Sequence, residues 1–559
     1  MDVDQRFVLR SPWKAPPPPK GQSLPDFFLG LLELPERRGR VFYYEGDEEV
    51  TFDGLAQRVR RLTAVLQQSL HLEKGDVVGT VLGNRLDYIT TVLAVQRLGA
   101  VVTTCNPAFT HEELGKQFSE VSVKFIVTEA AYVHMVEKAL AAMPTVKELI
   151  LVDEGDSSPS AKERYRTFDG LLQATNCPPD ATSLPTIDPD KDTAFILYSS
   201  GTTGFPKGAH INHQYYINFI AVVDATGDET GEFDPPRLSP DDRVLSVFQY
   251  FHAGGMTHIM WCAFVGCPIV GLGKYNLEKL LATIQRRKVT FLFLVPPILV
   301  RLAKSPVVDQ YDVSTLQRVI CSASPLDKHI AQMVVDRLGL KHLAQNFGMT
   351  ECFVTHLSPI DPSSTGKKMD SCGRLLPDIE GMVVDPESLQ PLPSNQQGEM
   401  WIKSPSQMLG YLRNPEATKE VIIDGQWIRT GDIAYYDDEG YWYIVDRLKE
   451  LIKVRGFQVP PAELEAVVLR HPMVAEVIVV GVKDEYSGEL PRAYVVLKAD
   501  APPPSEAVES DIQRFVDEHV VYYKRLKGGI RFVEELPKTG SGKLLRRQLR
   551  DQARSEGRM

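Results

Sequence analysis

An eleven-residue run of hydroxyls, glycines and one lysine constrains this chain more than any other feature. The run is Tyr198-Ser-Ser-Gly-Thr-Thr-Gly-Phe-Pro-Lys207-Gly208, and it follows Thr193–Leu197, an apolar stretch that predicts a buried strand. Such a turn suits phosphate, because glycines let backbone N–H groups face the anion while hydroxyls and lysine add donors and charge. The common nucleotide loop differs, since it needs Ser or Thr directly after its lysine. Taken alone, the run is more often a polar turn.

Length and composition limit the classes of protein that this chain can represent. At 559 residues it is too long for one ordinary core, so we expect two or more domains. The formal net charge of -11 argues against nonspecific nucleic-acid binding, which needs an excess of Lys and Arg. The 7 cysteines are scattered and never spaced C-x-x-C, which indicates reduced thiols inside a cell.

The apolar stretches and the C-terminal residues bear on the cellular compartment of the protein. The most apolar segments, Ile259–Gly273 and Phe291–Val300, are short and interrupted by Gly or Pro, so we expect no transmembrane segment. A cytoplasmic protein is the preferred interpretation. The alternative is the peroxisome, because the terminal Gly557-Arg558-Met559 has the basic middle residue and apolar end of a Ser-Lys-Leu address.

Hydrophobic periodicity predicts an α/β organisation. Leucines and valines at helical spacing predict a helix that begins near Phe52, and short apolar runs such as Val77–Leu82 and Phe291–Val295 predict parallel strands. The polar region Asp153–Asp192 predicts a long loop. After about residue 375, short strands and turns indicate a β-rich part. We place a domain boundary between residues 1–448 and 449–559, since the latter is long enough for a small α+β domain.

Three further clusters carry candidate chemistry. In Gln345–Glu351, Phe347 is suited to stack on a purine and Glu351 to hold Mg²⁺ through oxygen, although such a run is usually a loop with a packed ring. Asp432 and Arg447 are suited to bind ribose hydroxyls and phosphate oxygens. By themselves they are slightly more often a capped turn and a surface ion pair.

The last cluster is Pro537-Lys-Thr-Gly-Ser-Gly-Lys543, near the C-terminus. A lysine beyond a glycine-rich turn is usually just solvated. On a mobile domain, however, Lys543 would deliver positive charge to a reacting carboxylate and α-phosphate.

In order, spacing and residue type, these four runs resemble the ANL superfamily of adenylate-forming enzymes. Val295–Ile298, Gln345–Glu351 and Gly456–Glu465 are most similar to 4-coumarate:CoA ligases and related acyl-CoA ligases. The resemblance implies an α/β fold, with a large N-terminal domain of layered αβ sheets plus a β-rich subdomain and a small mobile α+β C-terminal domain. It implies an ATP-dependent carboxylic acid:CoA ligase that uses Mg²⁺ and makes an acyl-adenylate, then an acyl-CoA.

The resemblance also implies roles for individual residues. Thr350 would contact the α-phosphate and Glu351 would ligate Mg²⁺, while Asp432 and Arg447 would hold the ribose. The β- and γ-phosphates would be bound by Ser199, Ser200, Gly201, Thr202, Thr203, Gly204 and Lys207. The adenine would lie among Ser322, Ala323, Ser324, Asn346, Phe347, Gly348 and Met349.

Catalysis and the second half-reaction follow the same pattern. The resemblance implies that Lys543, Thr350, His252 and Lys207 are catalytic, with Lys543 stabilising the adenylation transition state. A hinge at Lys449 would rotate the small domain between the two steps. The thiolation site would then be lined by Lys453, Gly456 and Gln458, where the glycine admits the pantetheine arm.

The acid pocket departs from the family pattern in ways that bear on substrate. Asn346 and Ser322 stand where related ligases usually have glycine, and Phe347 replaces the commoner tyrosine. No Asp that would bind an α-ammonium group occurs in Phe251–His258 or Gly348–Thr355. We therefore expect an aryl (cinnamate- or benzoate-like) or medium-chain acid. The expected pocket residues are His252, Ala253, Gly254, Gly255, Ser322, Asn346, Gly348, Cys352 and Phe353.

Three other functions share these motifs. A free-standing adenylating enzyme would load a carrier protein in trans, and a luciferase-like oxygenase would add oxygen chemistry to the adenylate. A binding protein that has lost catalysis is disfavoured by the presence of Lys207, Glu351, Asp432, Arg447 and Lys543. His252, finally, is either the family's gating histidine or a histidine packed in the core.

Overall fold

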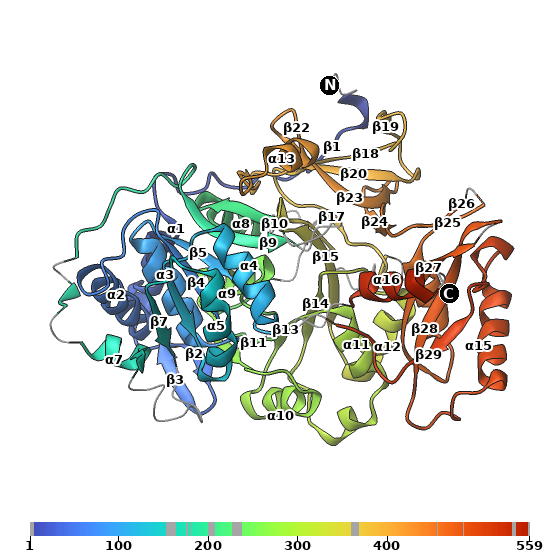
Figure 1. The fold of residues 1–559 in the computed structure, drawn as a ribbon, viewed down its shortest axis with the longest axis horizontal. Coiled ribbons are helices and arrows are strands. Elements are labelled where there is room, and N and C mark those ends of the chain that lie inside the picture. Colours follow the sequence, from blue (N-terminus) through green and yellow to red (C-terminus); the bar gives the residue numbers. More distant parts are fainter. Residues whose placement is uncertain are drawn as a thin grey trace.

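The computed structural model describes residues 5–152, 164–174, 177–179, 182–199, 207–225, 237–358, 368–455, 457–484, 486–538 and 544–556. Figure 1 shows a large N-terminal part, coloured blue to orange, and a smaller C-terminal part in red. This is the expected α/β architecture, with several sheets in the large part and a small α+β domain at the end of the chain.

The first sheet contains eight strands among the described residues and is parallel except at one edge. Its central strands are apolar and buried on both faces, as parallel strands covered by helices must be. The antiparallel β10 and β21 extend it beyond β9. In spatial order its strands are β21 (Gly410–Tyr411), β10 (Lys207–Asn212), β9 (Thr193–Ser199), β5 (Val101–Thr104), β4 (Val77–Val81), β6 (Phe125–Thr128), β7 (Glu148–Leu151) and β8 (Arg166–Thr167).

The second sheet has nine strands in the described part of the chain, and its central six are parallel. Antiparallel strands close both edges. In spatial order they are β17 (Arg374–Leu375), β16 (Phe353–Leu357), β15 (His342–Met349), β14 (Arg318–Cys321), β13 (Phe291–Leu294), β11 (Val244–Ser246), β12 (Ile269–Gly271), β2 (Val41–Glu45) and β3 (Glu48–Thr51).

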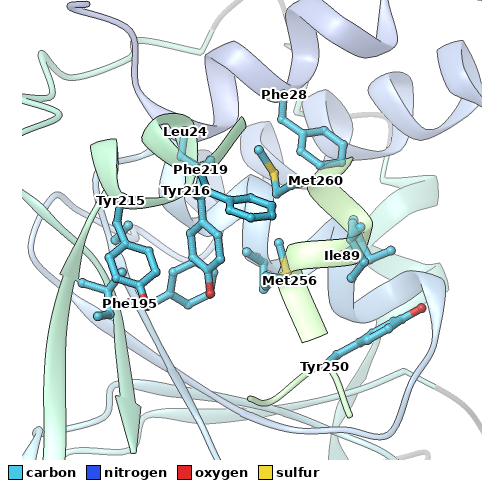
Figure 2. Packing of buried hydrophobic residues seen from close by; sticks show 14 of the residues in the cluster. Leu24, Phe28, Ile89, Phe195, Tyr215, Tyr216, Phe219, Tyr250, Met256 and Met260 are labelled. Atoms are coloured by element: carbon cyan, nitrogen blue, oxygen red, sulfur yellow. The ribbon is translucent and has the colours of Figure 1, made fainter. Parts of the chain in front are cut away.

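Helices cover these two sheets and form the layer between them. Figure 2 shows Tyr215, Tyr216 and Phe219 of α8 packed with Met256 and Met260 of α9 in the main hydrophobic core. The helices are α1 (Leu24–Leu32), α2 (Phe52–Gln68), α3 (Leu86–Arg97), α4 (His111–Glu120), α5 (Val133–Ala139), α7 (Phe168–Gln173), α8 (Gln214–Ala225), α9 (Ala253–Val265), α10 (Leu277–Arg287), α11 (Pro296–Lys304) and α12 (Lys328–Leu338).

The β-rich part is an antiparallel sheet of seven strands among the described residues. Helix α13 (Pro415–Val421) packs beside it. The strands are β1 (Leu9–Arg10), β18 (Glu380–Val384), β19 (Pro391–Leu392), β20 (Gly398–Lys403), β22 (Ile422–Ile423), β23 (Trp427–Tyr436) and β24 (Trp442–Arg447).

The C-terminal part has its own sheet and its own core. Strand β24 ends in the large domain at Arg447, and the next strand begins at Ile452 in the small domain. The domain boundary at residue 448 is consistent with this change of sheet and stays a prediction. The elements are β25 (Ile452–Val454), β26 (Phe457–Val459), α14 (Pro461–Leu469), β27 (Val474–Asp484), β28 (Gly488–Leu497), α15 (Glu506–His519), β29 (Ile530–Phe532) and α16 (Arg546–Glu556).

Several local expectations need correction. The region Asp153–Asp192 was expected to be a loop, but β8 and α7 lie within it, because Thr167 caps the helix through Gly170 N and Phe168 and Leu171 are buried. The run Gln345–Glu351, which alone reads as a loop, is largely part of β15. No helix among the described residues is long and apolar enough to cross a bilayer. The terminal Gly557-Arg558-Met559 lies outside those residues.

Candidate active site

The carboxyl ends of the parallel strands of both large sheets meet at one place in the large domain. Thr104, the last residue of β5, donates its hydroxyl to the carbonyl of Phe251 at 2.7 Å, which joins the two edges. Ser199 ends β9 and Ser322 follows β14, so the predicted phosphate and adenine residues lie at these ends. Open α/β sheets bind ligands in this position, because the loops there are free to present polar groups.

Ser199 and Lys207 face each other across the β9–β10 hairpin. The ammonium group of Lys207 lies 5.2 Å from the centroid of the Tyr411 ring. The hydroxyl oxygen of Ser199 is buried near the Tyr411 hydroxyl and has no partner of hydrogen-bond geometry among the described residues. A buried hydroxyl without a partner costs free energy, so a phosphate oxygen that accepts from it would remove that cost. Ser200, Gly201, Thr202, Thr203 and Gly204 lie outside the described residues.

Glu351 is buried, with an exposed fraction of 4%, and the Tyr411 hydroxyl donates to its carboxylate at 2.6 Å. Burial, followed by the Glu351 charge, raises the pKa of Tyr411. The backbone carbonyl of Glu351 accepts from Met408 N at 2.9 Å, which fixes the residue against the strand that carries Tyr411. Lys207, Tyr411 and Glu351 thus form one compact group, which we call the Lys207–Tyr411–Glu351 cluster.

This cluster fits a magnesium nucleotide. No group of three or more His, Cys, Asp or Glu side chains placed to hold a metal occurs among the described residues, and Glu351 is the single carboxylate of the cluster. Mg²⁺ is usually held in this manner, by one or two carboxylates together with substrate phosphates and waters. The Ser199 hydroxyl and Lys207, its register partner, are suitable partners for those phosphates.

The predicted adenine region is held together by Gln345. Its side chain accepts from Leu326 N at 2.8 Å and donates to the Leu326 carbonyl at 3.2 Å, which fastens the loop after β14 to β15. Within this loop, Ala323 has a φ of 74°, a left-handed conformation that is strained for a residue with a Cβ atom. The Ser322 hydroxyl is hydrogen-bonded to the side-chain oxygen of Asn346.

Phe347 lies on β15 opposite His356, with ring centroids 5.7 Å apart in an edge-to-face arrangement. Burial lowers the pKa of His356 to about 3, so this ring is neutral at physiological pH. Trp442 packs on the other side of His356, 5.1 Å away. The Phe347 ring is therefore supported by other aromatic rings and is only partly buried, as a ring that stacks on a purine must be.

Asp432 and Arg447 are register partners in the β23–β24 pair, and their side chains are 3.4 Å apart. Gly431 has a φ of 70°, which lets the chain turn before Asp432. Burial is the first cause that raises the pKa of Cys352, and the charges of Glu351 and Asp432 add to it. Both carboxylates therefore lie near one cysteine, which brings the predicted ribose and magnesium residues together.

Thr350, Cys352 and Phe353 line the junction between β15 and the helix layer. The Tyr215 hydroxyl of α8 donates to the carbonyl of Thr350 at 2.9 Å. Phe353 has a φ of 62° and is buried against three rings, those of Tyr215, Tyr216 and Phe219. Cys352 is also fully buried. Both side chains, which are predicted to line the acid pocket, thus belong to the main hydrophobic core.

His252 precedes α9 and is exposed, so it is not a histidine packed in the core. Its ring lies 4.3 Å from that of Phe251. A Cβ atom at Gly255 would lie 2.3 Å from the Gln249 carbonyl oxygen, so the start of α9 is pressed against the preceding turn. At Gly254 the nearest atom to such a Cβ is Phe248 Cδ2 at 4.0 Å, which leaves room beside His252.

The remaining predicted residues belong to the C-terminal part. Lys453 and Gln458 are register partners in the β25–β26 hairpin, and Lys449 lies exposed in the connection between the domains. Gly456 and Lys543 lie outside the described residues. Tyr411 was missed by sequence reasoning, because a tyrosine in the short Gly410–Tyr411 strand carries no motif and becomes informative only next to Glu351.

Comparisons with known proteins identify the family. The family model for the AMP-binding enzyme matches residues 34–412, and the model for the AMP-binding enzyme C-terminal domain matches residues 463–543. The chain is 37% identical to 4-coumarate–CoA ligase 5 of Oryza sativa subsp. japonica, over 98% of this chain and 98% of that relative.

Solved structures show the same fold. The anthranilate CoA ligase AuaEII, crystallised with anthranoyl-AMP, superposes with a TM-score of 0.85 at 23% identity, covering 97% of this chain and 99% of that one. ATP-bound MatB from Rhodopseudomonas palustris gives a TM-score of 0.81 at 25% identity, covering 95% and 99%. The chain therefore belongs to the AMP-binding enzyme family, the ANL superfamily of adenylate-forming enzymes, as its four motifs predict.

Proposed function

We propose that the protein is an ATP-dependent acid:CoA ligase that acts on an aryl carboxylic acid of the cinnamate or benzoate type. In the first step a carboxylate oxygen attacks the α-phosphorus of ATP and pyrophosphate leaves, which gives an acyl-adenylate. In the second step the thiol of coenzyme A attacks the acyl carbon, loses its proton and displaces AMP. The identity of the thiol acceptor and the class of acid are proposed in addition to the family assignment.

The Lys207–Tyr411–Glu351 cluster beside the Asp432–Arg447 pair is the observation that carries this proposal. A carboxylate is already ionised at neutral pH, so the first step needs no base to activate it. The barrier is the repulsion between two anions, and positive charge at the α-phosphate lowers it. Lys207 provides such charge at the phosphates, and Asp432 orients the ribose so that the α-phosphorus faces Thr350.

Glu351 would hold Mg²⁺, which neutralises phosphate charge when bound. Tyr411 orients the Glu351 carboxylate by donating to one of its oxygens. Phe347 would bind the adenine face, and the Ser322–Asn346 pair would close the same region with polar groups. His252 would stand at the acid pocket, with Ala253, Gly254, Gly255 and Gly348 shaping its walls.

We also propose that the C-terminal domain turns about Lys449 between the two steps. Lys543 would serve adenylation, and Lys453, Gly456 and Gln458 would serve thiolation. The small domain has its own hydrophobic core, which allows it to move as a body. The domains 1–448 and 449–559 would be the two rigid parts.

Two observations support an aryl acid. The relatives named as 4-coumarate–CoA ligases share 35–38% identity with this chain over most of its length. The space beside Gly254 and the hydrogen-bonded Ser322–Asn346 pair suit a flat acid with a polar substituent. A medium-chain fatty acid is the second candidate, because one methylene changes selectivity by only about 1–3 kcal/mol.

The test is mass spectrometry of the products from an acid panel with ATP and Mg²⁺, with and without CoA. The panel spans hydroxycinnamates, benzoates, arylacetates and C4–C12 fatty acids. CoA-dependent formation of an acyl-CoA from an aryl acid is the expected result. Acyl-adenylate that ignores CoA would favour a carrier protein or an oxygenase, which light emission or oxygen uptake would separate. No product across the panel would contradict the proposal.

A lysine variant tests the proposed division of labour. Lys543→Ala is expected to lose adenylation by about 100-fold or more, as when one transition-state donor is removed. Thiolation of a supplied acyl-adenylate should persist. Acid-dependent ATP–pyrophosphate exchange and CoA consumption measure the two steps separately, and unchanged exchange would refute the role of Lys543.

A further inference from the structure

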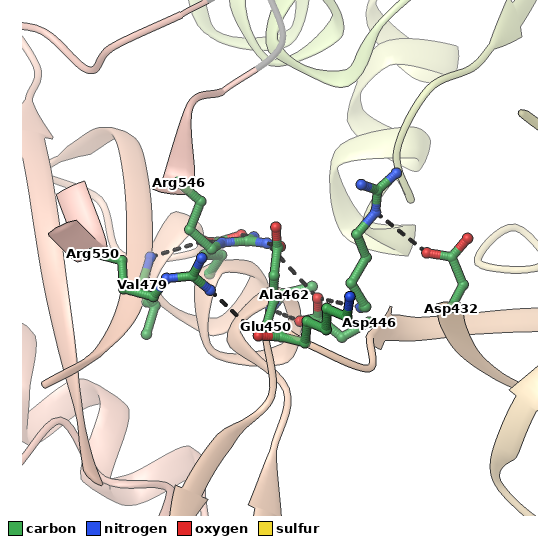
Figure 3. Close-up of polar contacts among 10 residues, drawn as sticks. Asp432, Asp446, Glu450, Ala462, Val479, Arg546 and Arg550 are labelled. Carbon is green, nitrogen blue, oxygen red and sulfur yellow. Dashed lines mark hydrogen bonds and ion pairs between the residues drawn. The ribbon is translucent and has the colours of Figure 1, made fainter. Parts of the chain in front are cut away.

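One arginine of the last helix is surrounded by three carboxylates at the junction of the two domains (Figure 3). Arg546, the first residue of α16, pairs with Glu465 at 2.7 Å and Asp446 at 3.7 Å, and is hydrogen-bonded to Glu450. The side chains are poorly exposed, at 19% for Arg546 and 4% for Asp446. We call these four residues the Arg546 cluster.

The Arg546 cluster joins three elements and the connection between the two domains. Asp446 belongs to β24 of the large domain, whereas Glu450 follows the proposed hinge, and Glu465 and Arg546 belong to α14 and α16. Asp446 also accepts from the backbone N of Ala462 at 2.9 Å, at the start of α14. Arg550 of α16 donates to the carbonyl of Lys449 at 3.3 Å. The last helix is therefore fastened to both sides of the hinge.

The cluster is connected to the nucleotide residues on one side. Asp446 accepts from the backbone N of Arg447 at 2.7 Å, and the Arg447 side chain pairs with Asp432, as Figure 3 shows. A chain of polar contacts thus runs from α16 through Asp446 and Arg447 to Asp432. It links the last helix to the predicted ribose site without any contribution from a ligand.

On the other side, the cluster is close in sequence to the segment that contains Lys543. Arg546 follows Lys543 by three positions in the sequence. The chain flanking residues 539–543 is closed on itself, because Leu545 N donates to the carbonyl of Pro537 at 2.8 Å and Lys538 pairs with Leu544 in a β-bridge. Lys538 is also ion-paired with Glu476 at 2.5 Å. The residues that flank this segment, Lys538 and Leu544, are therefore fixed to each other just before Arg546 in the sequence.

The Arg546 cluster contains three carboxylates but one guanidinium, and burial and charge shift the pKa values of its members. Burial raises the pKa of Asp446 to about 6, although Arg546 opposes the change. For Arg546, burial lowers the pKa, but Glu465, Asp446 and Glu450 outweigh that effect and raise it. One guanidinium therefore serves three carboxylates, of which Asp446 is the most buried.

Only one of these three carboxylates lies on the large-domain side of Lys449. A rotation about Lys449 would carry Glu450, Glu465 and Arg546 together and leave Asp446 behind. Arg546 would stay paired in either orientation, since two carboxylates travel with it, while its contact with Asp446 would exist in one orientation only. Packed interfaces of this kind favour two discrete arrangements over a continuous range.

We propose that Arg546 and Asp446 are positioning residues that fix the small domain in the orientation for adenylation. The proposal rests on the two-orientation mechanism proposed above. Neither residue touches substrate. Their contact holds the domain for the first half-reaction, and it must break before the second.

Asp446→Asn is the main test, because it keeps the size of the side chain and removes its charge. Acid-dependent ATP–pyrophosphate exchange should fall roughly 5- to 150-fold, the usual range of conformational coupling. Thiolation of a supplied acyl-adenylate should change by less than about threefold, and the KM for ATP should stay near its normal value because Asp432 is intact. Arg547→Met is the control, since Arg547 is 54% exposed and pairs with Asp551 in its own helix.

A distance measurement separates this proposal from the proposed function. The 7 native cysteines are all buried, so spin labels at Lys328→Cys in the large domain and Glu518→Cys in the small domain report the interdomain distance. Without any substrate, Asp446→Asn or Arg546→Met should broaden or shift the distance distribution, and Arg547→Met should not. The distance distribution could shift in these variants while the unsubstituted protein shows no ATP–pyrophosphate exchange with any acid. In that case the proposed function is wrong and the positioning role stands.

Two results would overturn the positioning role. One is an unchanged distance distribution in both variants. The other is an equal loss of adenylation and thiolation in Asp446→Asn, because a merely structural defect lowers both half-reactions alike.

Discussion

Tyr411 shows how one residue outside every motif can change the chemistry of a predicted ligand. Glu351 is expected to bind Mg²⁺, but in the structure one of its oxygens accepts from the Tyr411 hydroxyl at 2.6 Å. The remaining oxygen is thereby oriented, as groups behind a metal ligand usually orient it. The same tyrosine ring also lies next to Lys207, the lysine that is predicted to bind phosphate, and helps to position it.

Tyr411→Phe should therefore weaken magnesium use and leave the fold intact. Loss of a group behind a metal ligand commonly costs about 10- to 100-fold in metal affinity. We expect the Mg²⁺ concentration for half-maximal ATP–pyrophosphate exchange to rise about 10-fold or more, with a nearly normal rate at saturation. Tyr436→Phe is a matched control, because that hydroxyl bonds only weakly, to the Leu392 carbonyl at 3.4 Å. An unchanged Mg²⁺ requirement would contradict the orienting role.

At the scale of the element, the start of α9 decides where His252 stands. His252 N donates to the Gln249 carbonyl at 3.2 Å, and Gly255 N donates to the His252 carbonyl at 2.9 Å. The two glycines that follow Ala253 differ sharply in their surroundings, since one faces backbone and the other faces open space. The sequence alone does not distinguish them.

Gly255→Ala and Gly254→Ala form a matched pair. At Gly255 the new methyl would lie 2.3 Å from the Gln249 carbonyl oxygen, so the helix must move and the free energy of unfolding should fall by about 1–3 kcal/mol. Gly254→Ala should leave stability nearly unchanged and instead reduce activity toward the bulkier acids. Guanidinium denaturation and the acid panel measure these effects. Equal destabilisation by both would show that α9 is not pressed against the turn.

Secondary structure with a clear hydrophobic period was the part of the fold that the sequence predicted best. Periodicity in the sequence predicts α10 at its observed bounds, Leu277–Arg287, because its apolar residues are spaced for one buried face. It fails for α7, a short helix whose stability depends on packing and a threonine cap. It also cannot assign β15 as a strand, since Gln345–Glu351 acquires its pairing partners only from β14 and β16.

At the scale of the whole molecule, a lysine from the large domain holds the small one. Lys304, at the end of α11, donates to the carbonyls of Leu469 and Val474 at 2.9 and 3.1 Å. Burial lowers its pKa from 10.5 to about 8, and the charge of Lys498 adds to the effect. The contact belongs to the observed domain arrangement, as does the Arg546 cluster.

This lysine predicts a pH dependence of stability. Between about pH 8 and pH 10.5 the unfolded chain keeps a proton on Lys304 that the folded protein has lost, so folding is favoured as pH rises through this window. The melting temperature of the unsubstituted protein minus that of Lys304→Met should therefore increase between pH 7 and pH 10. Lys328→Met, on the exposed surface, should show a constant difference. A difference that shrinks with pH would contradict a desolvated Lys304.

The sequence by itself determined the family, the α/β class and the residue types of the nucleotide site. Hydrophobic periodicity acts over a few residues, and the four motifs keep their order and spacing along the chain, so both can be recognised without a structure. Asp432 and Arg447 were recognisable in this way before their pairing across β23 and β24 was known.

Only the tertiary structure decided which side chains meet. Tyr411 and Glu351 are 60 positions apart, and Arg546 and Glu450 are 96 apart, so no local pattern connects them. Their contacts arise because separate sheets and helices pack against one another, and burial then sets the charge state of groups such as Asp446. Packing brings distant residues together, and for that reason the Arg546 cluster could be found only in the folded chain.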